Sequence, residues 1–240
     1  MDGKLNRNRN ASIELLYLDE HIVVANKPSG LLVHRGWADD EDVAMFRVRD
    51  AVGAQVSPVH RLDRGTSGAL LFARSSVAAA LLGRDFENGN VDKRYLALVR
   101  GEPPEAGLID HPIPKQESGA RVEARTRFVR IARSSVDRCS LVEVMPETGR
   151  LHQIRRHLKH IHHPIIGDVN YGSGEINRHY RARYHLHRLA LHAHLLAFAH
   201  PISRERVVIT APLPDDLGSA LVALGLPCSS EKTGTEEALR

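Results

Sequence analysis

Apolar and polar residues alternate over short runs along most of this chain, and these runs predict its strands. The first run, residues 13–27, predicts two short strands around Asp19, Glu20 and His21, and the Pro-Ser-Gly turn at 28–30 ends the second strand. Alternation over 122–131 and 140–145 predicts two strands that pair across 133–138. Further strands are predicted at 69–73, 93–99 and 188–199.

Apolar residues at helical spacing predict four helices. Ser75 is placed to cap a helix that runs to about Glu87, and Thr148 is predicted to cap another over 151–160. Two more are expected over 43–52, after an acidic loop at 39–42, and over 215–224. Residues 101–119, which contain Pro and Gly, are expected to form an irregular connection. Adjacent pairs of strands with interspersed helices predict an α+β fold on a largely antiparallel sheet.

The breaks between these elements are typical of loops and not of domain linkers. We therefore expect a single domain over residues 13–228, preceded by a flexible N-terminus at 1–12 and followed by a disordered polar tail at 229–240. No apolar run reaches membrane-spanning length and the N-terminus lacks a signal-peptide core, so we expect a cytoplasmic protein without a membrane partner. Cys139 and Cys228 stand far apart, which supports neither a zinc ribbon nor a disulfide framework.

The positive charge of the chain is concentrated in its middle. Residues 121–188 carry 14 Lys and Arg against 6 Asp and Glu, whereas residues 1–120 carry 15 against 17 and residues 189–240 carry 4 against 6. Guanidinium groups suit phosphate because they bond to it bidentately and release its condensed counterions. A solvated charged face explains Arg121, Arg125 and Arg127 equally well, so charge alone leaves both interpretations open.

Residues 59–68, with the sequence V-H-R-L-D-R-G-T-S-G, set one carboxylate beside two guanidinium groups on a turn between apolar runs. Neighbouring arginines favour the carboxylate form of Asp63, which would then be available as a nucleophile or base. A strand-end ion pair with Thr66 and Ser67 closing a turn is the simpler alternative.

The segment from His60 to Gly68 resembles the H-R-L-D-x-x-T-S-G signature of the RluA family of pseudouridine synthases, which isomerise uridine in structured RNA. The N-K-P-S-G turn at 26–30 resembles the family's opening hairpin. Residues 148–158 resemble its T-G-R-x-H-Q-x-R-x-H-L segment, and residues 163–168 resemble its H-P-[IL]-x-G-D turn, to which we assign a structural part. The likeness spans residues 14–212 and implies a mixed sheet with the active-site cleft across its middle.

The resemblance also implies the roles of the site residues. Asp63 would be the catalytic residue, Tyr95 would lie against the uracil and remove the surplus proton, and Arg155 would pair with the catalytic Asp. Whether Asp63 adds to the sugar or abstracts a sugar proton stays open. Leu151, Ile154 and Leu158 form a core-facing stripe, which places Arg155 at its edge, and His152 and Gln153 are expected to make structural hydrogen bonds.

A target uridine inside folded RNA must leave its stack before it reaches a pocket. The resemblance implies that Arg61 fills the space of the flipped base, and a salt bridge from Arg61 to Asp63 is the alternative. His60, Arg64, Arg150 and Arg156 complete the predicted RNA-binding set. No S4-type RNA-binding module is expected before the first strand, so the catalytic domain would make the RNA contacts.

Several interpretations of the whole protein compete. Residues 31–37 and the compact length resemble the TruC-type branch of the family, which implies a uridine near the acceptor stem of tRNA as the target. A ribosomal RNA synthase of the same family is the first alternative. A non-catalytic RNA-binding protein would lack Asp63 or Tyr95. The fifteen histidines also suggest a metallohydrolase, but the predicted chemistry needs no metal and no other cofactor. No obligate protein partner is evident from the sequence.

Overall fold

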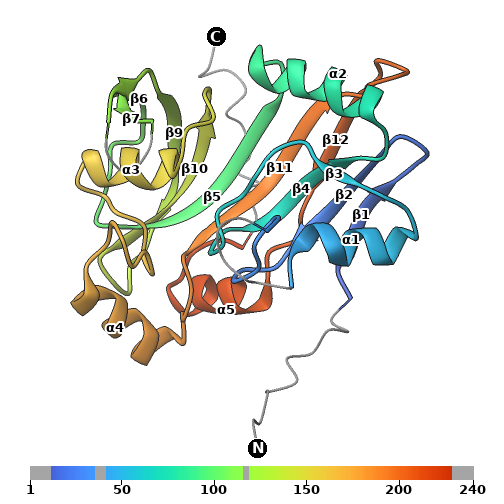
Figure 1. Cartoon of the computed structure of the whole chain (residues 1–240). Coiled ribbons are helices and arrows are strands. Elements are labelled where there is room, and N and C mark those ends of the chain that lie inside the picture. The colour runs from blue at the N-terminus through green and yellow to red at the C-terminus, as the bar shows by residue number, and fades with distance from the viewer. Residues whose placement is uncertain (1–11, 36–41, 116–118, 229–240) are drawn as a thin grey trace, which may run out of the picture. The chain divides into compact units, whose positions relative to one another are not determined.

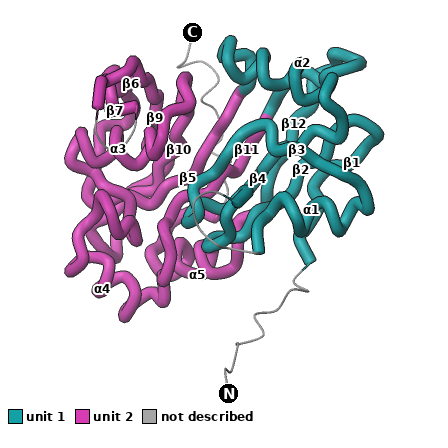
Figure 2. The backbone as a smooth tube through the Cα atoms, in the orientation of Figure 1, with its two compact units in different colours: residues 1–91, 197–211 teal, residues 92–196, 212–240 magenta. Residues whose placement is uncertain are grey.

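The computed structural model describes residues 12–35, 42–115 and 119–228 (Figure 1). The predictions of a flexible N-terminus and a disordered tail therefore lie outside the described residues, apart from residue 12, and so does most of the acidic loop at 39–42. The chain forms two compact units, one from residues 1–91 and 197–211 and the other from residues 92–196 and 212–240 (Figure 2). A single domain over 13–228 stays a prediction.

Unit 1 is built on an antiparallel set of strands in the order β1-β2-β4, with the short β3 also paired to β4. Every residue of β4 is buried, and β2 is buried at all positions but one, in keeping with the apolar runs at 69–73 and 22–25. The helix α2 packs against β4. The elements are β1 (Glu14–Leu18), β2 (Ile22–Lys27), α1 (Ala44–Val52), β3 (Ser57–Pro58), β4 (Ser67–Ala73), α2 (Ser76–Glu87) and β12 (Arg206–Thr210).

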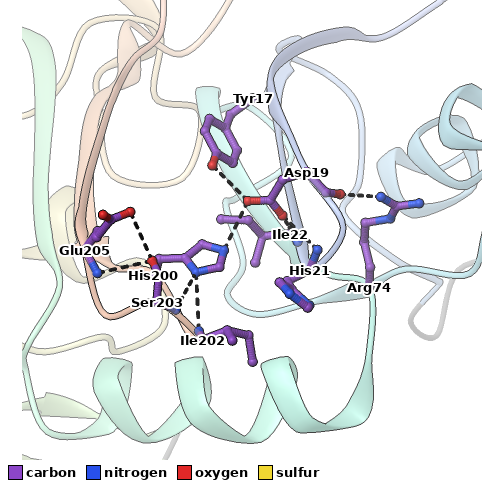
Figure 3. Close-up of polar contacts among 9 residues, drawn as sticks. All are labelled: Tyr17, Asp19, His21, Ile22, Arg74, His200, Ile202, Ser203 and Glu205. Atoms are coloured by element: carbon purple, nitrogen blue, oxygen red, sulfur yellow. Dashed lines mark hydrogen bonds and ion pairs between the residues drawn. The ribbon is translucent and has the colours of Figure 1, made fainter.

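One carboxylate organises the turn between β1 and β2 (Figure 3). Asp19 accepts hydrogen bonds from the backbone N–H groups of His21 and Ile22 at 2.7 and 2.9 Å, and from the Tyr17 hydroxyl at 2.8 Å. The imidazole of His200 lies 3.1 Å from the same carboxylate. Nδ1 of His200 accepts two backbone N–H groups, so its Nε2 carries the proton and donates to Asp19.

Unit 2 contains the antiparallel order β5-β10-β9-β6, and α3 packs against β9 and β10. The strand β11 (Leu191–Ala199) is divided between the units at residues 196 and 197. The other elements are β5 (Asp92–Arg100), β6 (Ala106–Asp110), β7 (Ile113–Pro114), β8 (Arg121–Val122), β9 (Arg125–Arg133), β10 (Cys139–Pro146), α3 (Gln153–His160), α4 (Gly174–Tyr184) and α5 (Asp215–Ala223).

These elements confirm the predicted α+β class and its largely antiparallel pairing. The prediction that Ser75 caps α2 is also confirmed, because its hydroxyl accepts the Ala78 N–H at 3.1 Å. The prediction that Thr148 caps a helix starting at 151 is wrong. The helix begins at Gln153 after His152, while the Thr148 hydroxyl accepts the Arg125 N–H at 3.1 Å and donates to Gln153 at 2.6 Å.

The segment 101–119 was expected to be irregular, but it contains β6 and β7. In β6 an added Cβ at Gly107 would lie 2.9 Å from the Phe128 ring, so this glycine allows the strand to approach the aromatic side chain of β9. The sequence analysis predicted neither β12 nor α4.

Candidate active site

Asp63 lies in the tight loop that joins β3 to β4, and this loop is held by the turn that follows β2. Lys27, the last residue of β2, is fully buried. Its ammonium group donates to the backbone carbonyls of Leu31 at 2.6 Å, Pro28 at 2.9 Å and Arg64 at 3.3 Å. One buried cation therefore bonds both to its own turn and to the residue that follows Asp63.

Three further hydrogen bonds join the same two segments. The Gly30 N–H donates to the Arg64 carbonyl at 2.7 Å, and the Arg64 guanidinium donates back to the Gly30 carbonyl at 2.9 Å. The Ser29 hydroxyl donates to the Gly65 carbonyl at 2.8 Å. Thr66, which is buried, closes the loop by donating its N–H to the Asp63 carbonyl at 3.0 Å. The backbone from the Asp63 carbonyl to Thr66 is thus held in place, and the Asp63 side chain is only partly exposed.

His60 and Arg61 precede Asp63 and differ sharply in their surroundings. His60 accepts the Leu71 N–H at 3.1 Å and stacks on Phe86 with ring centroids 4.9 Å apart, so it packs the loop onto β4 and α2. The Arg61 side chain is exposed, and within residues 12–35, 42–115 and 119–228 it makes no ion pair with Asp63. The alternative of a salt bridge from Arg61 to Asp63 is therefore not seen among these residues, and the insertion of Arg61 into the RNA stack stays a prediction.

Tyr95 belongs to unit 2, where it lies in β5 opposite Val144 of β10. The residue is 9% exposed, so its ring is largely enclosed. A phenol in this setting presents an apolar ring with a polar end, which is the type of surface against which a pyrimidine can lie.

Arg155 of α3 forms a buried bidentate ion pair with Asp168. Its Nε and Nη2 donate to the two carboxylate oxygens at 2.7 and 2.8 Å. Burial by itself would raise the pKa of Asp168, but the hydrogen bonds and charge of Arg155, with the N–H groups of Asn170 and Tyr171, hold that pKa below its usual value. Asp168 is therefore a carboxylate that orients Arg155, and this pairing partner was not recognised from the sequence.

The last two predicted RNA-binding residues flank this ion pair in the chain. Arg150 is exposed and donates to the Glu123 carbonyl at 3.2 Å. Arg156 donates to the Tyr171 hydroxyl at 2.9 Å and to the Pro114 carbonyl at 3.0 Å. Arg155 also lies over the Tyr171 ring, with its guanidinium carbon 5.0 Å from the centroid.

Gln153 connects the start of α3 to β9. Its side-chain oxygen accepts the Arg150 N–H at 3.0 Å, and its amide donates to the Arg125 carbonyl and the Thr126 hydroxyl at 2.8 and 3.0 Å. His152 contacts the Tyr171 hydroxyl at 3.0 Å. Both residues therefore make the structural hydrogen bonds expected of them.

Besides Asp168, two residues were missed as parts of the site. Lys27 was noticed only as part of a turn, and Tyr171 carried no signal of its own because its partners come from α3. The predicted residues fall into two groups: Asp63, His60, Arg61 and Arg64 lie in unit 1, and Tyr95, Arg150, Arg155 and Arg156 lie in unit 2. The meeting of Asp63 with Tyr95 and Arg155 stays a prediction.

Within the described ranges, no group of three His, Cys, Asp or Glu side chains is arranged to hold a metal ion. The same part of the chain has no helix long and apolar enough to span a bilayer.

Residues 21–160, more than half of the chain, match the family model of the RNA pseudouridylate synthases. The chain belongs to this family, and the resemblance to its RluA branch is confirmed, so the protein is an isomerase that acts on uridine in RNA.

Individual relatives point the same way. The chain is 42% identical over 221 residues to the tRNA pseudouridine synthase C of Pasteurella multocida (strain Pm70), which covers 83% of this chain and 91% of the relative. It is 40% identical over 225 residues to the protein of the same name from Vibrio parahaemolyticus, covering 85% and 91%. Among solved structures, human RNA pseudouridylate synthase domain containing 4 superimposes with a TM-score of 0.72 at 28% identity, covering 89% of this chain and 94% of that one.

Proposed function

We propose that this protein isomerises a specific uridine to pseudouridine in tRNA, near the acceptor stem. Relatives at about 40% identity that span most of the chain are named as tRNA pseudouridine synthases, which supports tRNA over ribosomal RNA as the substrate. A cytoplasmic location is part of this proposal.

The observation that carries the proposal is the fixed loop around Asp63. Isomerisation breaks the bond from N1 of uracil to C1′ of the ribose, forms a bond from C5 to C1′, removes the proton at C5 and leaves a proton on N1. A group acting at the sugar must hold its place while the base turns. The bonds from Lys27, Ser29 and Gly30 to the loop provide that fixed position for the Asp63 carboxylate.

The remaining roles follow from chemistry and placement. Arg61, exposed and not engaged by Asp63, enters the space that the flipped uridine leaves in the RNA stack. Tyr95 lies against the uracil and accepts the proton from C5 through its hydroxyl. Arg155, oriented by Asp168, keeps the catalytic carboxylate ionised. His60, Arg64, Arg150 and Arg156 shape the surrounding RNA-binding surface.

The test is the substitution Asp63→Asn, with Asp50→Asn as the matched control, because Asp50 is an exposed carboxylate of α1 in the same unit. Release of tritium from RNA that carries 5-tritiated uridine measures turnover, since the hydrogen at C5 leaves the base in the reaction. Asp63→Asn should abolish the release and change RNA affinity by no more than a few-fold, because phosphate contacts dominate binding. Turnover retained by Asp63→Asn would refute the assignment, and faster reaction on ribosomal RNA than on tRNA would refute the substrate.

A further inference from the structure

The helix α4 presents a basic surface to which none of the predicted site residues belongs. Asn177, Tyr180 and Tyr184 are buried and form its inward stripe. Arg178, Arg181 and Arg183 lie off that stripe and are exposed. These three arginines, here called the α4 arginine face, lie within six residues of one another and flank the buried stripe, Arg178 and Arg181 on one side and Arg183 on the other. The helix occupies the end of unit 2 away from β6 (Figure 1).

The arginines of β9 show what a solvated, internally neutralised face looks like in the same unit. Arg125 pairs with Asp110 at 3.0 Å, Arg127 with Glu147 at 2.5 Å and Arg133 with Glu102 at 3.4 Å. Each of these charges is balanced by a carboxylate of the protein, which favours the interpretation of β9 as a solvated face over that of an RNA-binding strand.

The α4 arginine face is different. Among the residues that the structure describes, Arg178, Arg181 and Arg183 form no ion pair with a carboxylate. Arg178 and Arg181 are three positions apart, and like charges at that spacing on a helix repel each other by a few tenths of a kcal/mol. An exposed group of this kind has its positive potential directed at solvent, where a polyanion can bind it.

α4 is also fixed to the predicted active-site residues of its own unit. The Asn177 side chain accepts the Gly167 N–H at 2.9 Å and donates to the Asp168 carbonyl at 2.9 Å. Asp168 in turn holds Arg155. The helix is thus bonded to the backbone of the residue whose carboxylate orients Arg155, which fixes α4 beside that part of unit 2.

A purely structural reason for these charges exists, because Arg181 and Arg183 lie in the last turn of α4, where positive charge offsets the helix dipole. That effect falls off within one turn and does not explain Arg178, which lies further back. Stabilisation of the helix dipole also predicts that removal of the charges lowers the stability of the protein and leaves its affinity for RNA unchanged.

We propose that the α4 arginine face binds backbone phosphates of the RNA substrate, outside the nucleotide that is modified. This inference rests on the proposed function, which makes RNA the substrate. Phosphates are the matching ligand because a planar guanidinium bonds to them bidentately and each such bond releases condensed counterions.

The experiment compares Arg178→Gln/Arg181→Gln/Arg183→Gln with the control Arg125→Gln/Arg127→Gln/Arg133→Gln in the full chain. Both variants remove three exposed charges from unit 2, but only the control removes charges that already have carboxylate partners. Affinity for tRNA is measured by fluorescence anisotropy over a series of salt concentrations, with turnover at saturating tRNA and urea unfolding measured in parallel.

We expect the slope of log affinity against log salt to fall by about 2 to 3 in the α4 variant, because each phosphate that the protein neutralises contributes about 0.7 to 0.9 to that slope. The control should keep the wild-type slope, and kcat should be unchanged in both. A third variant with lysine at the three α4 positions should restore most of the slope, because it keeps the charge.

An unchanged slope in the α4 variant, an equal fall in the control, or a fall in stability alone would overturn the proposal. Failure of the proposed function is seen separately, because wild-type protein would then release no tritium from tRNA while the slopes still report on phosphate binding.

Discussion

The buried ion pair between Arg155 and Asp168 makes the substitution Asp168→Asn the most informative single test of the site. The side chains of both partners are nearly inaccessible, at 9% and 0% exposure. Asparagine keeps the shape of Asp168 but removes its charge. Its amide N–H group would face an N–H donor of Arg155, where a carboxylate oxygen now accepts a hydrogen bond. Breaking a buried pair in this way costs about 3–5 kcal/mol, because it leaves an uncompensated buried charge.

Urea unfolding measures this cost. With a denaturant slope of about 3 kcal/mol/M, near the upper end for small proteins, the midpoint should fall by about 1 to 2 M. Asp50→Asn is the control, since its carboxylate is 65% exposed and its removal should change stability by less than about 0.5 kcal/mol. Turnover should fall as well in Asp168→Asn if Arg155 positions the catalytic carboxylate.

The pH dependence provides a second test of the same pair. The pKa of Asp168 is lowered in the native state. Its contribution to the free energy of unfolding is therefore complete above its unfolded-state pKa of 3.8, and is lost as pH falls through its native-state pKa. The stability difference between wild type and Asp168→Asn should therefore be constant at neutral pH and shrink below about pH 4. A difference of less than about 1 kcal/mol at neutral pH would refute the role assigned to this carboxylate.

Three more predictions test the fold around the site. Lys27→Met should lower turnover more than tRNA affinity in tritium-release and anisotropy assays, because the loop of Asp63 loses the Lys27 bond to the Arg64 carbonyl; equal losses in both would contradict this. Gly167→Ala should lower the urea midpoint strongly, since an added Cβ would lie 1.8 Å from the Arg188 carbonyl and the residue has a φ of +80°. Gly83→Ala in α2 is the control, because its Cβ would meet nothing within 4 Å and the midpoint should stay unchanged. His200→Ala should cost about 1–3 kcal/mol by leaving two backbone N–H groups and one oxygen of Asp19 without this imidazole, and an unchanged midpoint would count against that network.

Local patterns predicted the elements whose stabilisation is mostly local or strongly apolar. The β1 and β2 pair, β4, and α2 with its Ser75 cap were all predicted, because alternation and capping chemistry can be recognised within about ten residues. The motif around Asp63 was also recognisable, since its residues are consecutive in the chain.

The helix α4 shows why other parts were missed. Its inward stripe consists of Asn177, Tyr180 and Tyr184, not aliphatic side chains, so no hydrophobic periodicity marks it. It is held by bonds to distant residues, including Asn177 to Gly167 and the Tyr184 hydroxyl to Asp137 at 2.9 Å. Such contacts exist only after the chain has folded, and no local propensity predicts them.

By itself, the sequence determined the family and the α+β class, and it marked Asp63 as the candidate catalytic residue. These conclusions depend on residue types at fixed short spacings. Tertiary structure alone decided which charges are balanced. It gave Arg155 the carboxylate of Asp168, gave the arginines of β9 partners from other segments, and left the α4 arginine face without a carboxylate among the described residues. The physical reason is that an ion pair depends on distances of a few ångströms between side chains that, in these three pairs, the sequence places 13 to 20 residues apart.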